Sequence, residues 1–261
     1  MNAKIKVLII MLLTMFSVTE CLAADVYLYL TRHGKTMFNT VHRAQGWADT
    51  PLTSEGVEGA QKLGRGVQSV KFIAAWSSDA GRARETAQLV MQGWKKPLPL
   101  QESRGLREIN FGLFEGDLDE NMWGAAAKQV GYPSQAALMT AFSDRKIDLD
   151  QMIDAIKSAE AQGTEALKGI KSTGAAESYR QAATRLTRTI TDIAQQAQRQ
   201  GGGNVLVVSH GLAIMVLLKE LGETSVNHGL SNAGVTKIRY TDAGKFVIES
   251  IDDLSYVQNG S

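Results

Sequence analysis

The chain is poor in the residues that form covalent or metal cross-links. It has one cysteine, Cys21, and four histidines among its 261 residues. A lone cysteine cannot form an intramolecular disulfide, so the fold must be stabilised by its apolar core. The histidines form no H-x-x-H or mixed His/Cys cluster, and no metal site of recognisable spacing is predicted. Because Cys21 also lies in the segment predicted below to be removed, we expect chemistry that uses neither a thiol nor a metal or other cofactor.

The chain also lacks an excess of charge of either sign. Its 28 basic and 27 acidic residues give a net charge of +1, so no overall field attracts nucleic acid or an anionic membrane. A phosphate-binding G-x-x-x-x-G-K-[ST] loop is absent too, which argues against nucleotide hydrolysis of that type. Any anion site must therefore be local, and nucleic acid is not an expected partner.

Residues 7–18 form the one long apolar run, interrupted only by a threonine and a serine. Lys4 and Lys6 precede it, and the small residues Ala23-Ala24 follow it. A charged start, a short apolar stretch and small residues at the end are typical of a secretory signal peptide. We predict that residues 1–24 are removed and that the mature protein is secreted or periplasmic, without stable membrane association. A retained membrane anchor is the alternative.

Residues 25–261 alternate between strand-like and helix-like segments and carry no repeat. Such alternation favours an α/β fold, here a three-layer α/β/α sandwich with a mostly parallel sheet. Ser78 or Asp79 is expected to cap the second helix. The expected strands are 26–31, 72–77 and 205–209, with a short extended piece after Leu100 and a terminal hairpin of 235–240 and 246–251; the expected helices are 53–70, 78–94, 177–200 and 212–221.

Residues from about 117 to 174 differ from the rest because they show no strong strand. They hold two helix-like segments, 134–142 and 149–163. We predict a helical insertion over the active-site edge of the sheet, and a plain pair of packing helices is the alternative. Its bulky residues could contact a substrate or pack a small core of the insertion's own; they are Trp123, Tyr132 and Phe142.

Two histidines each follow a predicted strand. Arg32-His33-Gly34 ends the first strand, and Ser209-His210-Gly211 ends the strand at 205–209. In open α/β sheets ligands bind at the carboxyl ends of the strands, so the two imidazoles are expected at one edge. The arginine beside the first histidine adds a planar fork of donors suited to phosphate. The two motifs together indicate a phosphate site, so the expected partner is a small phosphorylated molecule.

These two motifs belong to a longer series. The series runs Arg32-His-Gly-Lys-Thr36, Asn39, Gln45-Gly46, Asp49-Thr-Pro-Leu-Thr53, Ser77-Ser-Asp79, Arg82-Ala83, Thr86-Ala87, Leu106-Arg107-Glu108-Ile109, Phe111-Gly112, Phe114-Glu-Gly116 and Ser209-His-Gly211. In this order the motifs resemble the histidine phosphatase superfamily, the phosphoglycerate mutase-like group. The resemblance is dense over residues 26–116 and sparse over 177–240.

The resemblance implies a role for each matching residue. His33 would be the nucleophile that becomes phosphohistidine. Glu108 would be the general acid that protonates the leaving alkoxide and then the base that activates water. His210 would complete the catalytic set. The implied phosphate pocket consists of Arg32, Arg82 and His210 with a hydrogen bond from Asn39, and its further contacts are Gln45 and the backbone of Gly46 and Gly211.

The chemistry of phosphoryl transfer agrees with this set. Transfer needs charge stabilisation on three equatorial oxygens, which two arginines and a protonated histidine supply without a metal. A covalent intermediate divides one difficult displacement into two easier ones. The residues alone do not choose Glu108 over Asp49 or Asp79 as the acid; only the family motif selects it. The chain departs from the pattern at Lys35, where Glu is common, and at Ala176, where Gly is common, and neither change removes a catalytic group.

We therefore predict an exported, metal-independent phosphomonoesterase that hydrolyses phosphate esters through a phosphohistidine. One alternative is a phosphoglycerate mutase-like phosphotransferase with the same pocket. Another is a non-catalytic protein that binds phosphorylated ligands. Gln45 resembles the phosphatase branch more than the mutase branch, and export argues against a glycolytic role. The motifs leave open which ester is the substrate and which oligomeric state the protein adopts.

Overall fold

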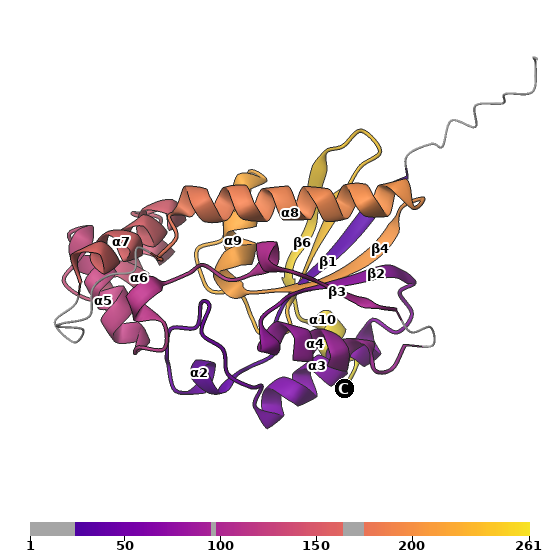
Figure 1. The fold of residues 1–261 in the computed structure, drawn as a ribbon, viewed down its shortest axis with the longest axis horizontal. Helices are drawn as coiled ribbons and strands as arrows, with labels where there is room; N and C mark the ends of the chain where they lie inside the picture. The colour runs from indigo at the N-terminus through magenta and orange to yellow at the C-terminus, as the bar shows by residue number, and fades with distance from the viewer. Residues whose placement is uncertain (1–23, 95–97, 164–174) are drawn as a thin grey trace, which may run out of the picture.

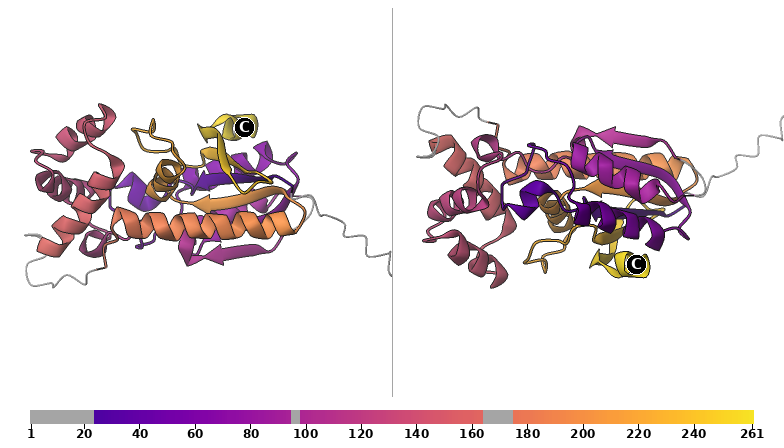
Figure 2. Two further views of the ribbon diagram at one scale, coloured as in Figure 1. Left: turned by 90° about the horizontal axis from the view of Figure 1, so that it is seen from above. Right: turned by 90° about the horizontal axis from the view of Figure 1, so that it is seen from below.

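The computed structural model describes residues 24–94, 98–163 and 175–261, so the predicted signal peptide lies, except for Ala24, outside the described residues. A sheet stands at the centre with helices on both faces (Figures 1 and 2). None of the helices in the described ranges is long and apolar enough to span a membrane. The strands are β1 (Val26–Arg32), β2 (Phe72–Ser78), β3 (Leu100–Ser103), β4 (Gly203–Ser209), β5 (Val235–Tyr240) and β6 (Phe246–Asp253).

The six strands lie in the order β3-β2-β4-β1-β5-β6. The first four run parallel, β5 is antiparallel to β1, and β6 is antiparallel to β5. The predicted α/β class, the mostly parallel sheet and the terminal hairpin are confirmed. Because β1 and β4 are parallel neighbours with Arg32 opposite Ser209, the two histidine motifs leave the sheet side by side.

Helices cover the two faces of the sheet in separate layers (Figure 2). One layer holds α3 (Ser54–Gly66), α4 (Gly81–Met91) and α10 (Ser255–Asn259), and the other holds α8 (Tyr179–Arg199) and α9 (Gly211–Glu220). Strand β1 is buried on both faces: Leu28 and Leu30 pack in the core with α8 and α9, whereas Tyr29 packs in the core with α3 and α4. Burial on both faces explains why this strand reads as a continuous apolar run.

The described part of the insertion, residues 117–163, contains three helices rather than the two predicted. They are α5 (Asp119–Gln129), α6 (Gln135–Ser143) and α7 (Leu149–Gln162). Helix α5 was missed because its apolar face is weak and buries only Met122, Ala126 and Ala127. The insertion lies at the end of the molecule toward which β1 and β4 run (Figure 1). Its buried side chains belong to the same core as those of α8 and α9, so it is continuous with the main domain.

The start of α4 also differs from the prediction. Its N-cap residue is Ala80, which has no capping side chain. Asp79, predicted to cap this helix, instead forms an ion pair with Arg107, in which Nε and Nη2 of Arg107 donate to the carboxylate at 2.6 and 2.7 Å. The N–H of Gly81 donates to the carboxylate of Asp49 at 2.6 Å, so the cap comes from a distant loop that local sequence does not reveal. Helices α3 and α4 both end about one turn earlier than expected.

Candidate active site

The carboxyl ends of β1 and β4 bring the two histidines together. The ring centroids of His33 and His210 are 5.2 Å apart, and the rings meet at 64°. Arg82 reaches them from the first turn of α4. Its side chain and that of His210 are fully buried, and His33 is 3% exposed. The register of the two strands therefore places the residues of both motifs, which are far apart in sequence, at one edge.

Hydrogen bonds determine the tautomer of His33. Its Nδ1 lies 2.8 Å from the carbonyl oxygen of Gly34, which can only accept, so Nδ1 carries the proton. Its Nε2 accepts from Nε of Arg82 at 3.2 Å. Burial, and then the charges of Arg82 and Arg32, hold the pKa of His33 well below its ordinary value. The imidazole is neutral with a lone pair on Nε2, which is the state a nucleophile needs.

Arg82 is held by the loop that follows α2 (Met37–Thr40). Its Nη1 donates to the carbonyl oxygen of Ala48 and to the carboxylate of Asp49, each at 2.9 Å. Its Nη2 donates to the carbonyl oxygens of Gln45 and Gly46 at 3.2 and 2.8 Å. All four terminal hydrogens of the guanidinium are thus bonded to the loop. The remaining Nε–H group of Arg82 faces His33, so the loop conformation determines the position of this donor.

Glu115 shapes this loop, although the sequence assigned it no role. The Glu115 carboxylate binds backbone N–H groups on one side of the loop, and the carbonyl groups of the loop therefore point at Arg82. The sequence signal was the Phe114-Glu-Gly116 motif, which does not reveal which groups the carboxylate meets. The carboxylate accepts four backbone N–H groups, those of Gly46 at 3.0 Å, Trp47 at 2.7 Å, Ala48 at 2.8 Å and Phe111 at 3.0 Å.

A cavity of about 340 Å³ opens beside this cluster. Five of the predicted site residues line it, and they are joined by residues of α5 and by apolar side chains. His33, Arg82 and His210 do not line this cavity. The lining includes Arg32, Asn39, Gln45, Glu108 and Gly211 from the predicted site, Asp119, Met122 and Trp123 from α5, and Phe111, Leu212, Met215 and Leu230.

Buried donors without partners point to an anion at this place. Arg32 donates Nη1 to the carbonyl oxygen of Leu230, but its Nε is buried and has no partner in the described part of the chain. Both ring nitrogens of His210 are buried and unpartnered there as well. Buried polar groups normally have a partner, and phosphate oxygens would supply one for the Arg32 Nε–H and for one ring nitrogen of His210. Over the same described ranges, no three His, Cys, Asp or Glu side chains are grouped so as to hold a metal ion.

The charge of His210 differs from the expected one. The sequence-based expectation was a protonated imidazole, but burial, followed by Arg82, His33 and Arg32, holds the pKa of His210 well below its ordinary value. The protein's own groups therefore favour the neutral ring. A phosphate dianion beside it would act in the opposite direction, because a nearby negative charge favours the protonated form.

Glu108 lies against the first turn of α9. Its Oε1 accepts from the backbone N–H of Ile109 at 2.9 Å and of Ala213 at 2.8 Å, and its Oε2 accepts from Leu212 at 3.0 Å. Burial raises the pKa of Glu108, and these N–H groups and Arg82 oppose the rise without cancelling it. A raised pKa suits a carboxyl group that must carry a proton. Because Oε1 already accepts two hydrogen bonds and Oε2 accepts one, Oε2 is the oxygen available to hold that proton.

An ion pair holds the segment that carries Glu108. Arg185 of α8 donates Nε to Oε1 of Glu177 at 2.9 Å and Nη2 to Oε2 at 2.6 Å. The same guanidinium donates to the carbonyl oxygens of Gly105, Arg107 and Glu108. Glu177 therefore positions the segment of the proposed acid, even though the chain departs from the family pattern just before it.

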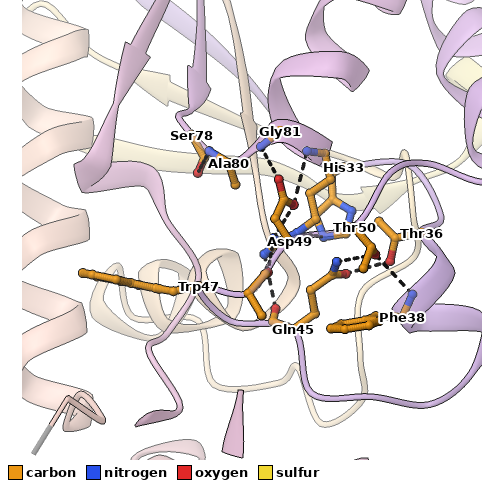
Figure 3. Close-up of polar contacts among 12 residues, drawn as sticks. His33, Thr36, Phe38, Gln45, Trp47, Asp49, Thr50, Ser78, Ala80 and Gly81 are labelled. Atoms are coloured by element: carbon orange, nitrogen blue, oxygen red, sulfur yellow. Dashed lines mark hydrogen bonds and ion pairs between the residues drawn. The ribbon is translucent and has the colours of Figure 1, made fainter. Parts of the chain in front are cut away.

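The remaining predicted contacts are partly occupied by the protein itself. The Gln45 side chain accepts from Thr36 at 2.7 Å and donates to Thr50 at 2.8 Å (Figure 3). The N–H of Gly46 is bonded to Glu115, so the predicted phosphate contact through that group is not available in this geometry. This prediction failed because the sequence does not show where a loop N–H points.

Asn39 and Gly211 are better placed for a ligand. The Asn39 Oδ1 accepts from the N–H of Thr36 at 3.2 Å, which leaves its NH₂ group as the donor toward the cavity. Gly211 packs against the predicted phosphate arginine: a Cβ atom there would lie 3.4 Å from Nε of Arg32. A side chain at position 211 would therefore crowd the unpartnered Nε of Arg32.

Known proteins share both sequence and fold with this chain. The model of the histidine phosphatase superfamily (branch 1) matches residues 28–137 and 145–253. The crystal structure of phosphoglycerate mutase from Bacillus anthracis is 43% identical with a TM-score of 0.83, over 92% of this chain and 99% of that one. "Probable phosphoglycerate mutase GpmB" of Salmonella choleraesuis is 25% identical over 239 residues, 88% of this chain and 94% of the relative. Phosphoserine phosphatase of Entamoeba histolytica shares the fold, with a TM-score of 0.60 and 22% identity over 89% of this chain and 99% of that one.

Proposed function

The chain belongs to the histidine phosphatase superfamily, and on that premise we propose that it is an exported, metal-independent phosphomonoesterase that works through a phosphohistidine on His33. One observation carries the proposal. The neutral imidazole of His33 holds its Nε2 lone pair against the Nε–H of Arg82, behind a cavity where the buried Nε of Arg32 has no partner in the described residues. A nucleophile thus lies next to an unsatisfied cationic donor that lines a cavity able to take a phosphate group.

The first step transfers the phosphoryl group to the protein. Nε2 of His33 attacks phosphorus in line with the ester oxygen, and the phosphorus–oxygen bond to the alcohol breaks. Glu108 gives the proton on its Oε2 to the departing alkoxide. As the nitrogen–phosphorus bond forms, Nε2 of His33 can no longer accept a hydrogen bond. The Nε–H of Arg82 then donates to a phosphoryl oxygen instead and keeps its proton. Arg32 and His210 bind the remaining oxygens and stabilise their charge.

The second step returns the protein to its starting state. The Glu108 carboxylate takes a proton from a water molecule as the water oxygen attacks phosphorus. The nitrogen–phosphorus bond breaks, its electron pair returns to Nε2 of His33, and inorganic phosphate leaves. The proton on Nδ1 stays on the ring throughout, because it is bonded to the carbonyl oxygen of Gly34.

A phosphoglycerate mutase-like phosphotransferase is the second candidate. The 43% identity to the Bacillus anthracis phosphoglycerate mutase favours it. It would use the same first step and return the phosphoryl group to a sugar acid rather than to water. The two candidates therefore differ only in the acceptor of the second step.

The test uses the mature protein, residues 25–261, and a panel of sugar, acid, nucleotide and peptide phosphates. We expect release of inorganic phosphate from at least one ester, a trapped phosphoenzyme that His33→Ala abolishes, and a rate unchanged by EDTA. Conversion of 3-phosphoglycerate to its 2-isomer without phosphate release, followed by phosphorus NMR, would favour the mutase. A rate that chelation stops and zinc restores would contradict the metal-free mechanism. Binding of esters without a phosphoenzyme would leave only a phospholigand-binding role.

Export is a separate part of the proposal. It rests on the charged start, the apolar run of residues 7–18 and the small residues that follow. Mass spectrometry of protein from the envelope fraction should give a mature chain that begins near Ala24 or Asp25. An intact Met1 on a membrane-bound form would instead identify the segment as an anchor.

A further inference from the structure

Part of the cavity wall comes from the insertion rather than from the sheet loops. Helix α5 contributes Asp119, Met122 and Trp123 to it. Met122 is fully buried and Trp123 packs half-buried against the shared core. The wall beyond the phosphate donors is therefore largely apolar, and its charged members outside the predicted site are Asp119 and Arg43.

Asp119 is unusual for a site that must hold a phosphate dianion. It is half-buried, and within the described ranges no hydrogen bond or ion pair reaches its carboxylate. Burial raises the pKa of Asp119, and the charges of His42 and Arg32 oppose that rise. A partly desolvated carboxylate costs free energy unless a donor meets it. A ligand that brings such a donor would satisfy it, whereas a ligand that brings a second carboxylate would be repelled.

Arg43 does not cancel this effect. Its side chain is exposed, and its Nη1 donates to the carbonyl oxygen of Gly116 at 2.6 Å. Exposed charges are screened by water and salt, while partly buried charges are screened less. Asp119 therefore has more effect than Arg43 on whether the cavity accepts an alcohol group of a given charge.

We infer that the cavity takes a compact phosphate monoester whose alcohol carries a hydrogen-bond donor or a cationic group and no carboxylate, with Asp119 as the specificity-determining residue. The inference rests on the proposed phosphatase function and names its substrate class. The volume of about 340 Å³ is near the lower end of the roughly 300–1,000 Å³ usual for ligand sites, which fits a small ester better than a phosphopeptide. The apolar side chains of α5 and α9 fit its carbon skeleton.

Two pairs of esters test the inference, because one member of each pair has a carboxylate where the other has a hydroxymethyl group or a hydrogen. They are glycerol 3-phosphate with 3-phosphoglycerate, and phosphoethanolamine with phosphoserine. For the wild-type mature protein we expect kcat/KM to favour the member without the carboxylate by about tenfold or more in both pairs. Asp119→Asn should reduce this ratio at least about threefold, because the repulsion is removed while the size is kept. Glu120→Gln is the matched control: its residue is exposed, adjacent on α5 and outside this cavity, so the ratio should stay unchanged.

Dissociation constants for the same four esters, measured by calorimetry, separate this inference from the proposed function. If no ester is turned over but the affinity ratio still depends on Asp119, phosphatase activity is wrong and the assignment of Asp119 stands. If turnover is normal but the wild type binds both members of each pair equally, or prefers 3-phosphoglycerate and phosphoserine, the inference about Asp119 is overturned while the proposed phosphatase function stands. A ratio that changes in Arg43→Gln and not in Asp119→Asn would overturn it as well.

Discussion

The loops at the strand ends and the helices of the insertion both border the cavity, but they are built differently. The region at the strand ends holds buried polar groups whose positions are fixed by hydrogen bonds, as Arg82 of α4 is by the 45–49 segment and Glu108 by the start of α9. Helices α5 to α7 are an apolar packing unit that shares its core with α8 and sends few side chains to the cavity. Reaction chemistry and recognition of the alcohol thus depend on separate parts of the fold, one tied to the sheet and one carried on helices.

The largest effect should come from the strand-end histidines. His33→Ala removes the atom that forms the covalent intermediate and should lower kcat on the order of 10⁴-fold or more. His210→Ala removes a donor to the phosphoryl oxygens and should cost about 10²–10³-fold in kcat. Steady-state rates with several esters measure both changes. A similar loss from a substitution in α5 would contradict the division between chemistry and recognition.

Substitution of the proposed acid should separate substrates by leaving group. Glu108→Gln cannot donate a proton, so alkyl phosphates should lose about 10²–10⁴-fold in the rate of His33 phosphorylation. An aryl phosphate with a good leaving group should be much less affected. Rapid-quench trapping of the phosphoenzyme gives these rates directly. Equal losses for both substrate types would remove Glu108 from the acid role.

Glu115 should act on the chemistry through Arg82. In Glu115→Gln the side chain can no longer accept four N–H groups, so the loop and Arg82 should shift, and kcat should fall about 10–100-fold. Because Arg82 helps to lower the pKa of His33, the acid limb of the pH profile should move to higher pH. Glu120→Gln is the control. An unchanged pH profile with a lower Tm would indicate a structural role only.

Stability should depend on pH through the buried histidines of the sheet edge. The pKa values of His33 and His210 are lowered in the folded protein, so below pH about 6.5 the unfolded state binds more protons. The free energy of unfolding should fall as pH decreases from about 6.5, by up to about 1.4 kcal/mol per pH unit for each histidine. Urea titrations between pH 7.5 and 5.5 measure the slope. His210→Gln should make it shallower; the same slope in that variant would refute the assignment.

The smallest effect on the chemistry should come from the insertion. Trp123→Ala enlarges the cavity and should raise KM for the preferred ester a few-fold, while kcat for a small aryl phosphate changes little. A point variant is preferred to trimming residues 117–174, because the insertion shares its core with α8 and its removal would uncover apolar surface. An unchanged ranking across the ester panel would count against a role of the insertion in specificity.

Tyr132 and Phe142 show how much about the insertion could be predicted from the sequence. Both were bulky candidates beside Trp123, but Phe142 is buried in the shared core and Tyr132 packs against it. Neither lines the cavity, whereas Trp123 does. Hydrophobic pattern identifies a residue that will be buried, but it does not say whether a ligand or a neighbouring helix will cover it.

By itself, the sequence determined the α/β alternation and the placement of two histidine motifs after strands that become neighbours. These features are local patterns of apolarity and turn residues, so they can be read one segment at a time. Only the tertiary structure decided the tautomer of His33, the neutral state favoured at His210, the role of Glu115 and the entry of Asp119 into the cavity. Each of these depends on burial and on hydrogen bonds between residues far apart in the chain. Such energies are defined only when the packed neighbours are in place.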